Sequence, residues 1–286
     1  MNTLRCPKTH VIACDLDDSL VATKKHSEQS RRASDEALLR IGALVTSLRA
    51  QSSQPVYFGS ATGRTFNSIQ ELAAERPAFD TIFRMMDFHI ASVGTAIHAG
   101  ARADFRRISG WPRVDSWDRE TIIERLPEGN GLTLQAPIAQ DTYKVSYLTT
   151  STAPTAEHAA QLKSRLGDDL QADVIVSGDG SWRFVDVLPT SINKGSALLQ
   201  LPQLLQEHDP ASEDRNMSEI CRIAVGDSMN DQEALAAAGV SIMPHNCQPD
   251  LLEWAAGNRS TNTFYHADED FAAGVLQGLR LHLYGS

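Results

Sequence analysis

The sequence has few cysteines and no clusters of basic residues. Its four cysteines lie far apart in a chain of 286 residues, at Cys6, Cys14, Cys221 and Cys247. This spacing excludes a dense disulfide scaffold and does not match a zinc site. The net charge of −10 comes without any run rich in Lys and Arg, which disfavours general binding to nucleic acid or to an anionic membrane. Any anionic ligand must therefore meet local positive charge.

Long hydrophobic runs are also missing. The first ten residues, MNTLRCPKTH, lead into a short strand without the apolar region of a signal peptide, and no apolar span reaches membrane length. We therefore expect a cytoplasmic protein with no membrane partner. With 42% hydrophobic and 22% charged residues, the composition is that of a globular protein with a buried core. The length favours a core domain with an insert.

Strands and helices alternate in the first part of the chain. The run His10–Cys14 is short, apolar and followed by acids, which is typical of a buried parallel strand that ends at a loop. Residues 34–48 have apolar residues at helical spacing after a plausible cap at Ser34. A second strand over 55–60 and a helix over about 65–75 follow. This alternation predicts a parallel sheet.

The pattern changes between residues 87 and 188. Longer polar connections and a helix near 156–166 separate the strand-like segments Phe88–Ser92, Leu132–Gln135, Tyr143–Leu148 and Arg183–Val187. After Pro189 the alternation returns, with an exposed loop expected over Glu207–Asp214. We therefore predict an α/β fold with a Rossmann-like parallel-sheet core, formed by 1–86 and 189–286, and an inserted α+β cap domain over 87–188.

The segment DLDDSL follows the first predicted strand. Asp15 and Asp17 stand two residues apart in extended chain, so both carboxylates point to the same side at the crevice end of the sheet. One carboxylate can act as a nucleophile and the other can move a proton, provided that a cation reduces their repulsion. The alternative is an ordinary acidic turn between a strand and a loop.

The segment GDSMND repeats this arrangement later in the chain. Asp227 and Asp231 follow the apolar run CRIAV and precede a predicted helix. Two acidic clusters at two strand ends offer the all-oxygen ligands that Mg²⁺ prefers, whereas zinc would favour His or Cys. Helix capping by Asn230 or Asp231 is the simpler explanation, and it is compatible with a metal site.

Two further polar segments, SATGR at 60–64 and NKG at 193–195, lie at junctions between regular elements. Thr62 and the free amides of the Gly63 turn can donate to phosphate oxygens, and Lys194 can neutralise phosphate and carboxylates. Taken singly, a Thr-Gly turn or a lysine is usually structural. The order of all four segments is the specific signal.

Four motifs in this order, DxDx(T/S), a Thr or Ser after a strand, a Lys, and GDxxND, resemble the haloacid dehalogenase superfamily of phosphotransferases. The insert falls between the second and third motifs, where the superfamily's sugar-phosphate branch carries an α+β cap. Finer similarities to the sucrose-phosphate phosphatases span nearly the whole chain: SVGT at 92–95, KVSY at 144–147, DVLP at 186–189, NCQPDLLEW at 246–254 and AAGVLQGL at 272–279.

This resemblance implies that Asp15 attacks phosphorus, while Asp17 protonates the leaving sugar oxygen and then activates water. Thr62 and Lys194 would hold the phosphoryl oxygens. The Mg²⁺ ligands implied in the same way are Asp15, the backbone carbonyl of Asp17, and Asp227. Asp231 would support both the metal and Lys194. The chain departs from the family pattern at three positions, Ser19, Met229 and Ala96. Of these, Ala96 stands where an acidic residue is expected.

Sugar recognition is expected from the cap closing over the core. The candidates are Gln135, Lys144 and Asp186, although Lys144 could lie on an exposed strand face and Asp186 could cap the return to the core. Gly63, Arg64 and Asn230, which stand inside the core motifs, complete the predicted substrate-binding set. The isolated histidines His89, His98 and His245 are assigned no role, because a lone histidine is more often structural than a ligand.

Three functions are consistent with the resemblance. The first is hydrolysis of a disaccharide phosphate, with sucrose 6-phosphate ahead of mannosylfructose phosphate and glucosylglycerol phosphate. The second is a broad sugar-phosphate phosphatase or a phosphomutase. The third is a non-catalytic regulatory domain that partners a sugar-phosphate synthase, which the presence of both Asp15 and Asp17 disfavours. A receiver domain is much shorter and carries no cap.

Overall fold

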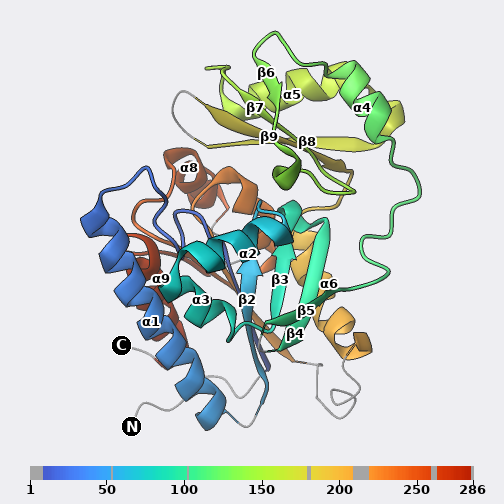
Figure 1. The fold of residues 1–286 in the computed structure, drawn as a ribbon. Helices are drawn as coiled ribbons and strands as arrows, with labels where there is room; N and C mark the ends of the chain where they lie inside the picture. The colour runs from blue at the N-terminus through green and yellow to red at the C-terminus, as the bar shows by residue number, and fades with distance from the viewer. Residues whose placement is uncertain are drawn as a thin grey trace.

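The computed structural model describes residues 9–52, 54–101, 103–178, 182–208, 219–258 and 263–284. Figure 1 shows a large core with a smaller cap above it. The chain enters the cap after strand β5 and returns to the core before helix α6. The predicted α/β fold with an inserted cap is confirmed.

The core is built on an eight-stranded sheet in the order β12-β11-β10-β1-β2-β3-β4-β5. Neighbouring strands are parallel from β12 to β3, and β4 and β5 extend the sheet as antiparallel strands. The strands are β1 (Thr9–Cys14), β2 (Val56–Ala61), β3 (Phe88–Ala91), β4 (Ala96–Ala101), β5 (Asp104–Arg107), β10 (Ile220–Val225), β11 (Val240–Met243) and β12 (Thr263–His266).

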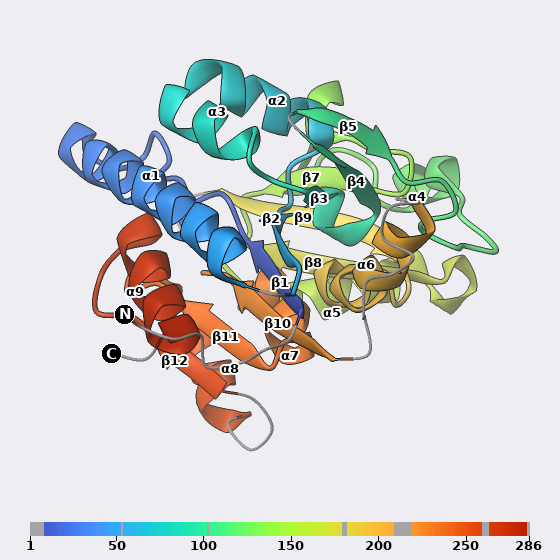
Figure 2. The same cartoon turned by 90° about the horizontal axis from the view of Figure 1, so that it is seen from below.

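Helices cover both faces of this sheet. The core helices are α1 (Glu28–Gln51), α2 (Phe66–Glu75), α3 (Pro77–Phe83), α6 (Lys194–His208), α7 (Gln232–Ala237), α8 (Pro249–Gly257) and α9 (Phe271–Tyr284). Ile12 packs with residues of α1, α2, α3 and α9, whereas its neighbour Val11 packs with α6, α7 and α8, because adjacent side chains of a strand point to opposite faces. Figure 2 shows α1 and α9 on one side of β1 and β10, and α6 on the other.

The cap has its own antiparallel sheet in the order β6-β7-β9-β8. Its elements are α4 (Arg119–Arg125), β6 (Leu132–Leu134), β7 (Val145–Thr149), α5 (Thr155–Leu166), β8 (Ala172–Ser177) and β9 (Arg183–Pro189). Residues of α4 and α5 form an apolar core with one face of this sheet, including Ile122, Leu162, Val185 and Val187. The other face is turned toward the core domain (Figure 1).

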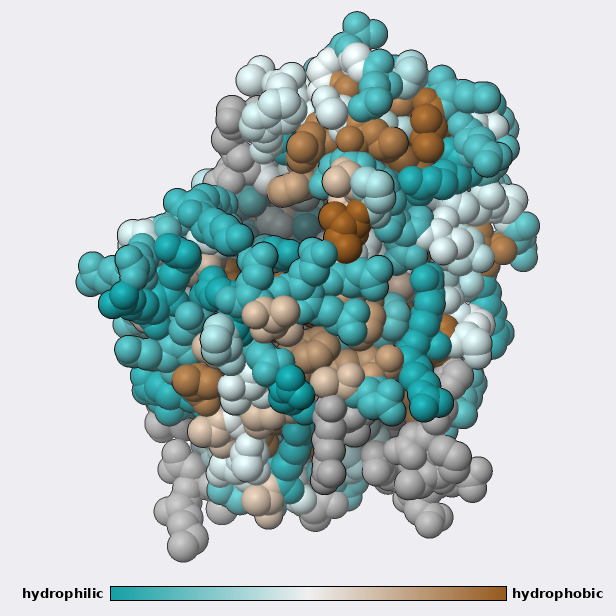
Figure 3. Space-filling model, in the orientation of Figure 1, coloured by the Kyte–Doolittle hydropathy of each residue, from teal (hydrophilic) through white to brown (hydrophobic). Residues whose placement is uncertain are grey.

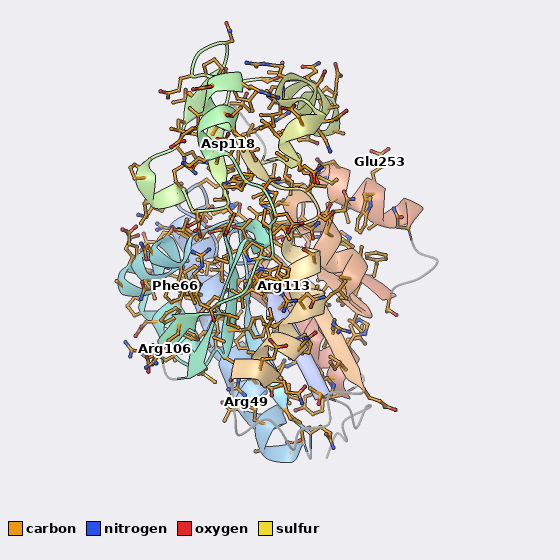
Figure 4. The ribbon with its side chains drawn as sticks, turned by 90° about the vertical axis from the view of Figure 1, so that its right-hand side faces the viewer. Arg49, Phe66, Arg106, Arg113, Asp118 and Glu253 are labelled. Atoms are coloured by element: carbon orange, nitrogen blue, oxygen red, sulfur yellow. The ribbon has the colours of Figure 1, made fainter. Side chains whose placement is uncertain are left out.

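The cap begins later than the sequence predicted. Strands β3, β4 and β5 lie in the large sheet, so the expected boundary at residue 87 assigned residues 88–107 to the wrong sheet. The antiparallel β3–β4–β5 hairpins have the sequence pattern of an α+β insert, and sequence alone did not show that β3 pairs with β2. The first helix of the cap is α4, capped by Asp118, which Figure 4 labels in the upper part of the molecule.

The long helix α1 also differs from expectation. It begins at Glu28, where the Ser27 side chain accepts a hydrogen bond from the Ser30 amide, so Ser34 is not its cap. Ser34 is instead buried within the helix and accepts from the Ala22 amide. Neither α1 nor any other helix of the described ranges combines the length and the apolarity needed to cross a membrane. Residues 207 and 208 of the predicted loop over 207–214 belong to the end of α6. The rest of that segment lies outside the described residues.

Candidate active site

The predicted catalytic residues meet at the carboxyl end of the large sheet. Asp15 follows β1 directly, Thr62 follows β2, and Asp227 lies two residues beyond the end of β10. The parallel register pairs Cys14 with Val225 on one side and with Ser60 on the other, so the three strands end side by side. The structure therefore brings these three motifs together at one end of the sheet.

Lys194 lies at the centre of this site. Its side chain is fully buried at the start of α6. The Nζ atom donates to Oδ1 of Asp15 at 2.9 Å, to Oδ1 of Asp231 at 2.6 Å and to Oδ1 of Asn230 at 2.7 Å. Burial alone would lower the pKa of Lys194, but the carboxylates of Asp15 and Asp231 raise it. The lysine therefore carries a fixed positive charge that ties the first acidic motif to the last.

Three buried carboxylates form a group suited to a cation. One oxygen from each of Asp15, Asp227 and Asp231 lies within 4.8 Å of the others. Burial raises the pKa of Asp15 to about 8, with Lys194 opposing the shift and Asp231 adding to it. Burial and the charge of Asp15 likewise raise the pKa of Asp227. Such repulsion between buried acids is relieved when a cation binds among them.

Some carboxylate oxygens of this group accept hydrogen bonds, and others are left to bind a cation. Asp231 receives Lys194 on Oδ1 and the amides of Asp227 and Ser228 on Oδ2, so it is better placed to orient its neighbours than to bind metal. Within the described part of the chain, Asp15 and Asp227 use only Oδ1, toward Lys194 and Ser19 respectively. Their second oxygens fit the hard-oxygen preference of Mg²⁺. Ser19 thus keeps a hydroxyl contact to Asp227.

Asp17 does not join the acidic group through its side chain. Its two carboxylate oxygens each accept a hydrogen bond of 2.7 Å from Arg64. Arg64 is fixed in turn by a hydrogen bond of 2.9 Å from its Nη1 to the Ser68 hydroxyl. Two members of the predicted site, one from DLDDSL and one from SATGR, are therefore joined by a bidentate ion pair.

The SVGT segment contacts two motifs of the site. Its residues Ser92 and Val93 have positive φ values of 53° and 59°, a conformation that non-glycine residues rarely adopt. The turn lets the Val93 amide donate to the Thr62 carbonyl at 3.0 Å. Gly94 lies so close to the chain at Asn193 that an added Cβ would stand 2.2 Å from the Asn193 carbonyl oxygen. The SVGT segment therefore contacts both the SATGR and the NKG motifs.

A cavity of about 510 Å³ lies between the site and the cap. Figure 3 shows the hollow between the two parts of the molecule. Of the predicted site residues, Lys194 and Asp231 lie behind its wall, and the lining contains Asp15, Asp17, Thr62, Gly63, Arg64, Gln135, Lys144, Asp186, Asp227 and Asn230.

The cap reaches the core at the Thr62–Thr65 loop. Lys144 is buried, donates to the Gly63 carbonyl at 2.9 Å and lies 3.5 Å from Asp186. The Thr65 hydroxyl donates to the Ile138 carbonyl at 2.7 Å. The alternative that Lys144 lies on an exposed strand face is therefore wrong. Gln135 lines the cavity, and its side-chain amide donates to the Tyr147 carbonyl at 3.3 Å.

The cavity residues that were not predicted from sequence include three large apolar ones, Ile138, Trp182 and Phe184. Their only sequence signal is the presence of large apolar residues in polar surroundings. The histidines given no role do not line this cavity. His89 and His98 pair across β3 and β4 beside Phe66, a residue labelled in Figure 4. Ala96, the departure noted in the sequence, is fully buried in β4 and does not line the cavity either.

Comparison with known proteins identifies the family. The model of the sucrose-6F-phosphate phosphohydrolase family matches residues 8–283. The chain belongs to this family. Sucrose-phosphatase 1 of Nicotiana tabacum is 30% identical over 284 residues, which are 98% of this chain and 60% of that protein. This chain therefore spans about 60% of the length of such plant relatives.

Two further relatives and two solved structures are similar to this chain. Probable sucrose-phosphatase 1 of Arabidopsis thaliana is 30% identical over 98% of this chain and 61% of that protein. Mannosylfructose-phosphate phosphatase of Agrobacterium fabrum is 27% identical over 68% of this chain and 72% of that protein.

The structure of the Synechocystis sucrose-phosphatase, solved with sucrose and phosphate, matches with a TM-score of 0.68 at 23% identity, over 96% of this chain and 98% of that chain. A phosphatase of the haloalkanoate superfamily from Bacteroides thetaiotaomicron matches with a TM-score of 0.57 at 16% identity, over 97% and 96%. These structural matches establish the fold.

Proposed function

We propose that this protein hydrolyses a sugar phosphate through a phospho-aspartate intermediate. The observation that carries the proposal is the fully buried Lys194, which bridges the buried Asp231 and Asp15, a residue of the cavity lining. A buried lysine between acids costs desolvation energy, and a merely structural ion pair is often replaceable by apolar residues. Here Asp15 faces the cavity with Lys194 directly behind it, so the lysine charge can neutralise the nucleophile and a phosphoryl group bound to it.

In the first step, an oxygen of Asp15 attacks the phosphorus and the bond from phosphorus to the sugar oxygen breaks. Asp17 donates its proton to that leaving oxygen, and Lys194 and Thr62 hold the phosphoryl oxygens. The sugar leaves as an alcohol and the phosphoryl group remains on Asp15. Asp17 reaches the leaving group when Arg64 gives up one of its two hydrogen bonds, and the remaining bond keeps the carboxyl group oriented.

In the second step, Asp17 takes a proton from water, and that water attacks the phosphorus. Phosphate leaves, and Asp15 regains its carboxylate. Asp15 and Asp227, with the backbone carbonyl of Asp17, would hold Mg²⁺, and Asp231 would orient the ligands from its hydrogen bonds to Lys194 and to the Asp227 amide. When bound, Mg²⁺ supplies positive charge to the phosphoryl oxygens and to the nucleophile.

Sucrose 6-phosphate is the leading substrate in this proposal. Family membership and the plant relatives support a sucrose phosphate. The similarity to mannosylfructose-phosphate phosphatase supports another disaccharide phosphate as the alternative, and glucosylglycerol phosphate or a broader range of sugar phosphates remains within the same chemistry. The relatives reported above are phosphatases by name and give no support to a synthase partner. A non-catalytic regulatory role is disfavoured because the complete acidic set is present.

The proposal is tested by measuring phosphate release from a panel of sugar phosphates, first with Mg²⁺ and then with EDTA. The panel contains sucrose 6-phosphate, mannosylfructose phosphate, glucosylglycerol phosphate, fructose 6-phosphate and glucose 6-phosphate. We expect release from a disaccharide phosphate that is lost in EDTA. A rate that requires a sugar bisphosphate would indicate a mutase instead, and no release from any member would contradict the proposed function.

A further inference from the structure

The cap sheet has one face covered by helices and one face open to the cavity. Val185 and Val187 of β9 pack in the cap's apolar core with α4 and α5. Because side chains alternate along a strand, Phe184 and Asp186 point to the opposite face. Both line the cavity, together with the neighbouring Trp182. The open face is therefore turned toward the catalytic carboxylates.

This open face carries exposed apolar side chains where a solvated sheet face would carry polar ones. Trp182, next to the start of β9, is 51% exposed and Phe184 of β9 is 48% exposed, and Ile138, in the connection between β6 and β7, lines the same cavity and is 37% exposed. Across the described ranges only two other large apolar residues are as exposed, Leu39 and Leu199, and neither lines the cavity. We call Ile138, Trp182 and Phe184 the apolar wall. A concentration of exposed apolar side chains in one cavity indicates a binding surface.

The apolar wall and the catalytic group share a single cavity. The lining runs from Asp15 and Thr62 in the core to Trp182 and Phe184 in the cap. Its volume of about 510 Å³ lies in the range of pockets that enclose a whole small molecule. A phosphoryl group at Asp15 occupies only one end of this space. In Figure 3, hydrophobic side chains gather on the cap above the hollow.

We propose that the apolar wall stacks against the unphosphorylated ring of a disaccharide phosphate and thereby selects two-ring over one-ring substrates. A sugar ring presents C–H bonds on its faces, which the negative face of an aromatic ring attracts. Its hydroxyls lie around the edge, where polar groups of the same cavity such as Gln135 and Ser177 can bond to them. The inference rests on the proposed function, because it assumes that the phosphoryl group binds at Asp15.

The kinetic test compares Trp182→Ala and Phe184→Ala with the parent protein on sucrose 6-phosphate and fructose 6-phosphate. Leu39→Ala, which removes an equally exposed apolar side chain from α1 outside the cavity, is the matched control. We expect the ratio of kcat/KM for the two-ring substrate to that for the one-ring substrate to fall by about tenfold or more in each wall variant. The effect should be mainly on KM. A ratio that stays at the parent value in both wall variants overturns the inference.

A binding test separates this inference from the proposed function. Unphosphorylated sucrose is titrated into the parent protein and into Trp182→Phe while tryptophan fluorescence is followed. We expect a saturable change that is lost in Trp182→Phe, since the other tryptophans lie outside the cavity lining. If no sugar phosphate is hydrolysed but this Trp182-dependent signal appears, the proposed function is wrong, while the contact between Trp182 and a sugar is supported. Hydrolysis with neither the signal nor a changed ratio overturns the wall alone.

Discussion

Arg64 donates two parallel hydrogen bonds to Asp17, from Nε and Nη2 to the two carboxylate oxygens, each 2.7 Å long. The pair joins the loop after β1 to the loop after β2, and it holds the proposed proton donor in one orientation. Only a guanidinium can make this planar two-point contact, because an ammonium is a single point charge. The geometry predicts that charge alone cannot replace Arg64.

Arg64→Lys should lower kcat by about tenfold or more, as expected when a general acid loses its orientation. Arg64→Ala should be no better. Steady-state kinetics on the best substrate of the panel checks this. Arg49→Lys is the matched control, because Arg49 also donates to a carboxylate, that of Asp87, at the opposite end of the core from the cap (Figure 4). Equal kcat values for Arg64→Lys and the parent would show that the two-point contact of Arg64 does not orient Asp17 for proton transfer.

Lys194→Met should destabilise the metal-free protein. The substitution leaves Asp15 and Asp231 buried without their cation, and breaking such a buried pair typically costs about 3–5 kcal/mol. Urea unfolding at neutral pH in EDTA measures the change in the free energy of unfolding. Lys144→Met is the comparison, since Lys144 is equally buried but has a single acid, Asp186, at 3.5 Å, and its loss should cost less. A larger loss for Lys144→Met would contradict the central place of Lys194.

Asp227→Asn should weaken Mg²⁺ binding by at least about tenfold, because it removes a charged oxygen ligand. Since a ligand that binds the folded state raises its stability, Mg²⁺ should raise the Tm of the parent and raise that of Asp227→Asn much less. Asp17→Asn should keep the parent's response, because its side chain contacts Arg64 and lies outside the acidic group. Equal responses in the two variants would show that the metal site has been assigned to the wrong carboxylates.

The position of these residues at strand ends and the presence of an inserted cap followed from sequence, but the residue at which the cap begins did not. Apolar runs that end in acids located β1 and β10, and the parallel register then placed Asp15 beside Asp227. Such information is local, because a buried strand and its loop are visible in a few residues. The correct sheet for β3 depends on pairing with β2, a contact between distant segments that periodicity does not encode.

The residues on the cavity-facing side of the cap were also not predicted from sequence. Trp182 and Phe184 have the same apolar character as core residues, so a pattern of residue types cannot tell a cavity wall from a core. Their role becomes visible only when the alternation along β9 is combined with the position of α4 and α5 on the other face. Likewise, the close approach of Gly94 to Asn193 required the fold, although SVGT was already noted as a shared segment.

The paired histidines of β3 and β4 should make stability depend on pH. Burial lowers the pKa of His89 to about 3 and that of His98 to about 4, whereas an unfolded histidine titrates near about 6.5. As pH falls below that value, the unfolded chain binds protons that the native chain does not, so the free energy of unfolding falls until about pH 4 through His98 and until about pH 3 through His89.

His98→Phe should reduce the slope of this decline between pH 7 and pH 5. A phenyl ring can preserve the stacking of His98 on Phe66, whose ring centroids lie 4.1 Å apart, while removing the proton site. Urea unfolding at several pH values gives both slopes, and the same slope for His98→Phe and the parent would show that His98 is not a source of acid sensitivity.

The most direct measurement is the rate of phosphate release from sucrose 6-phosphate by the parent protein and by Asp15→Asn, both in Mg²⁺. Circular dichroism and Tm establish that the variant is folded. The account predicts turnover by the parent and none by Asp15→Asn, because the variant keeps the cavity and Lys194 but lacks the nucleophilic carboxylate. Turnover by folded Asp15→Asn near the parent rate would contradict the phospho-aspartate mechanism.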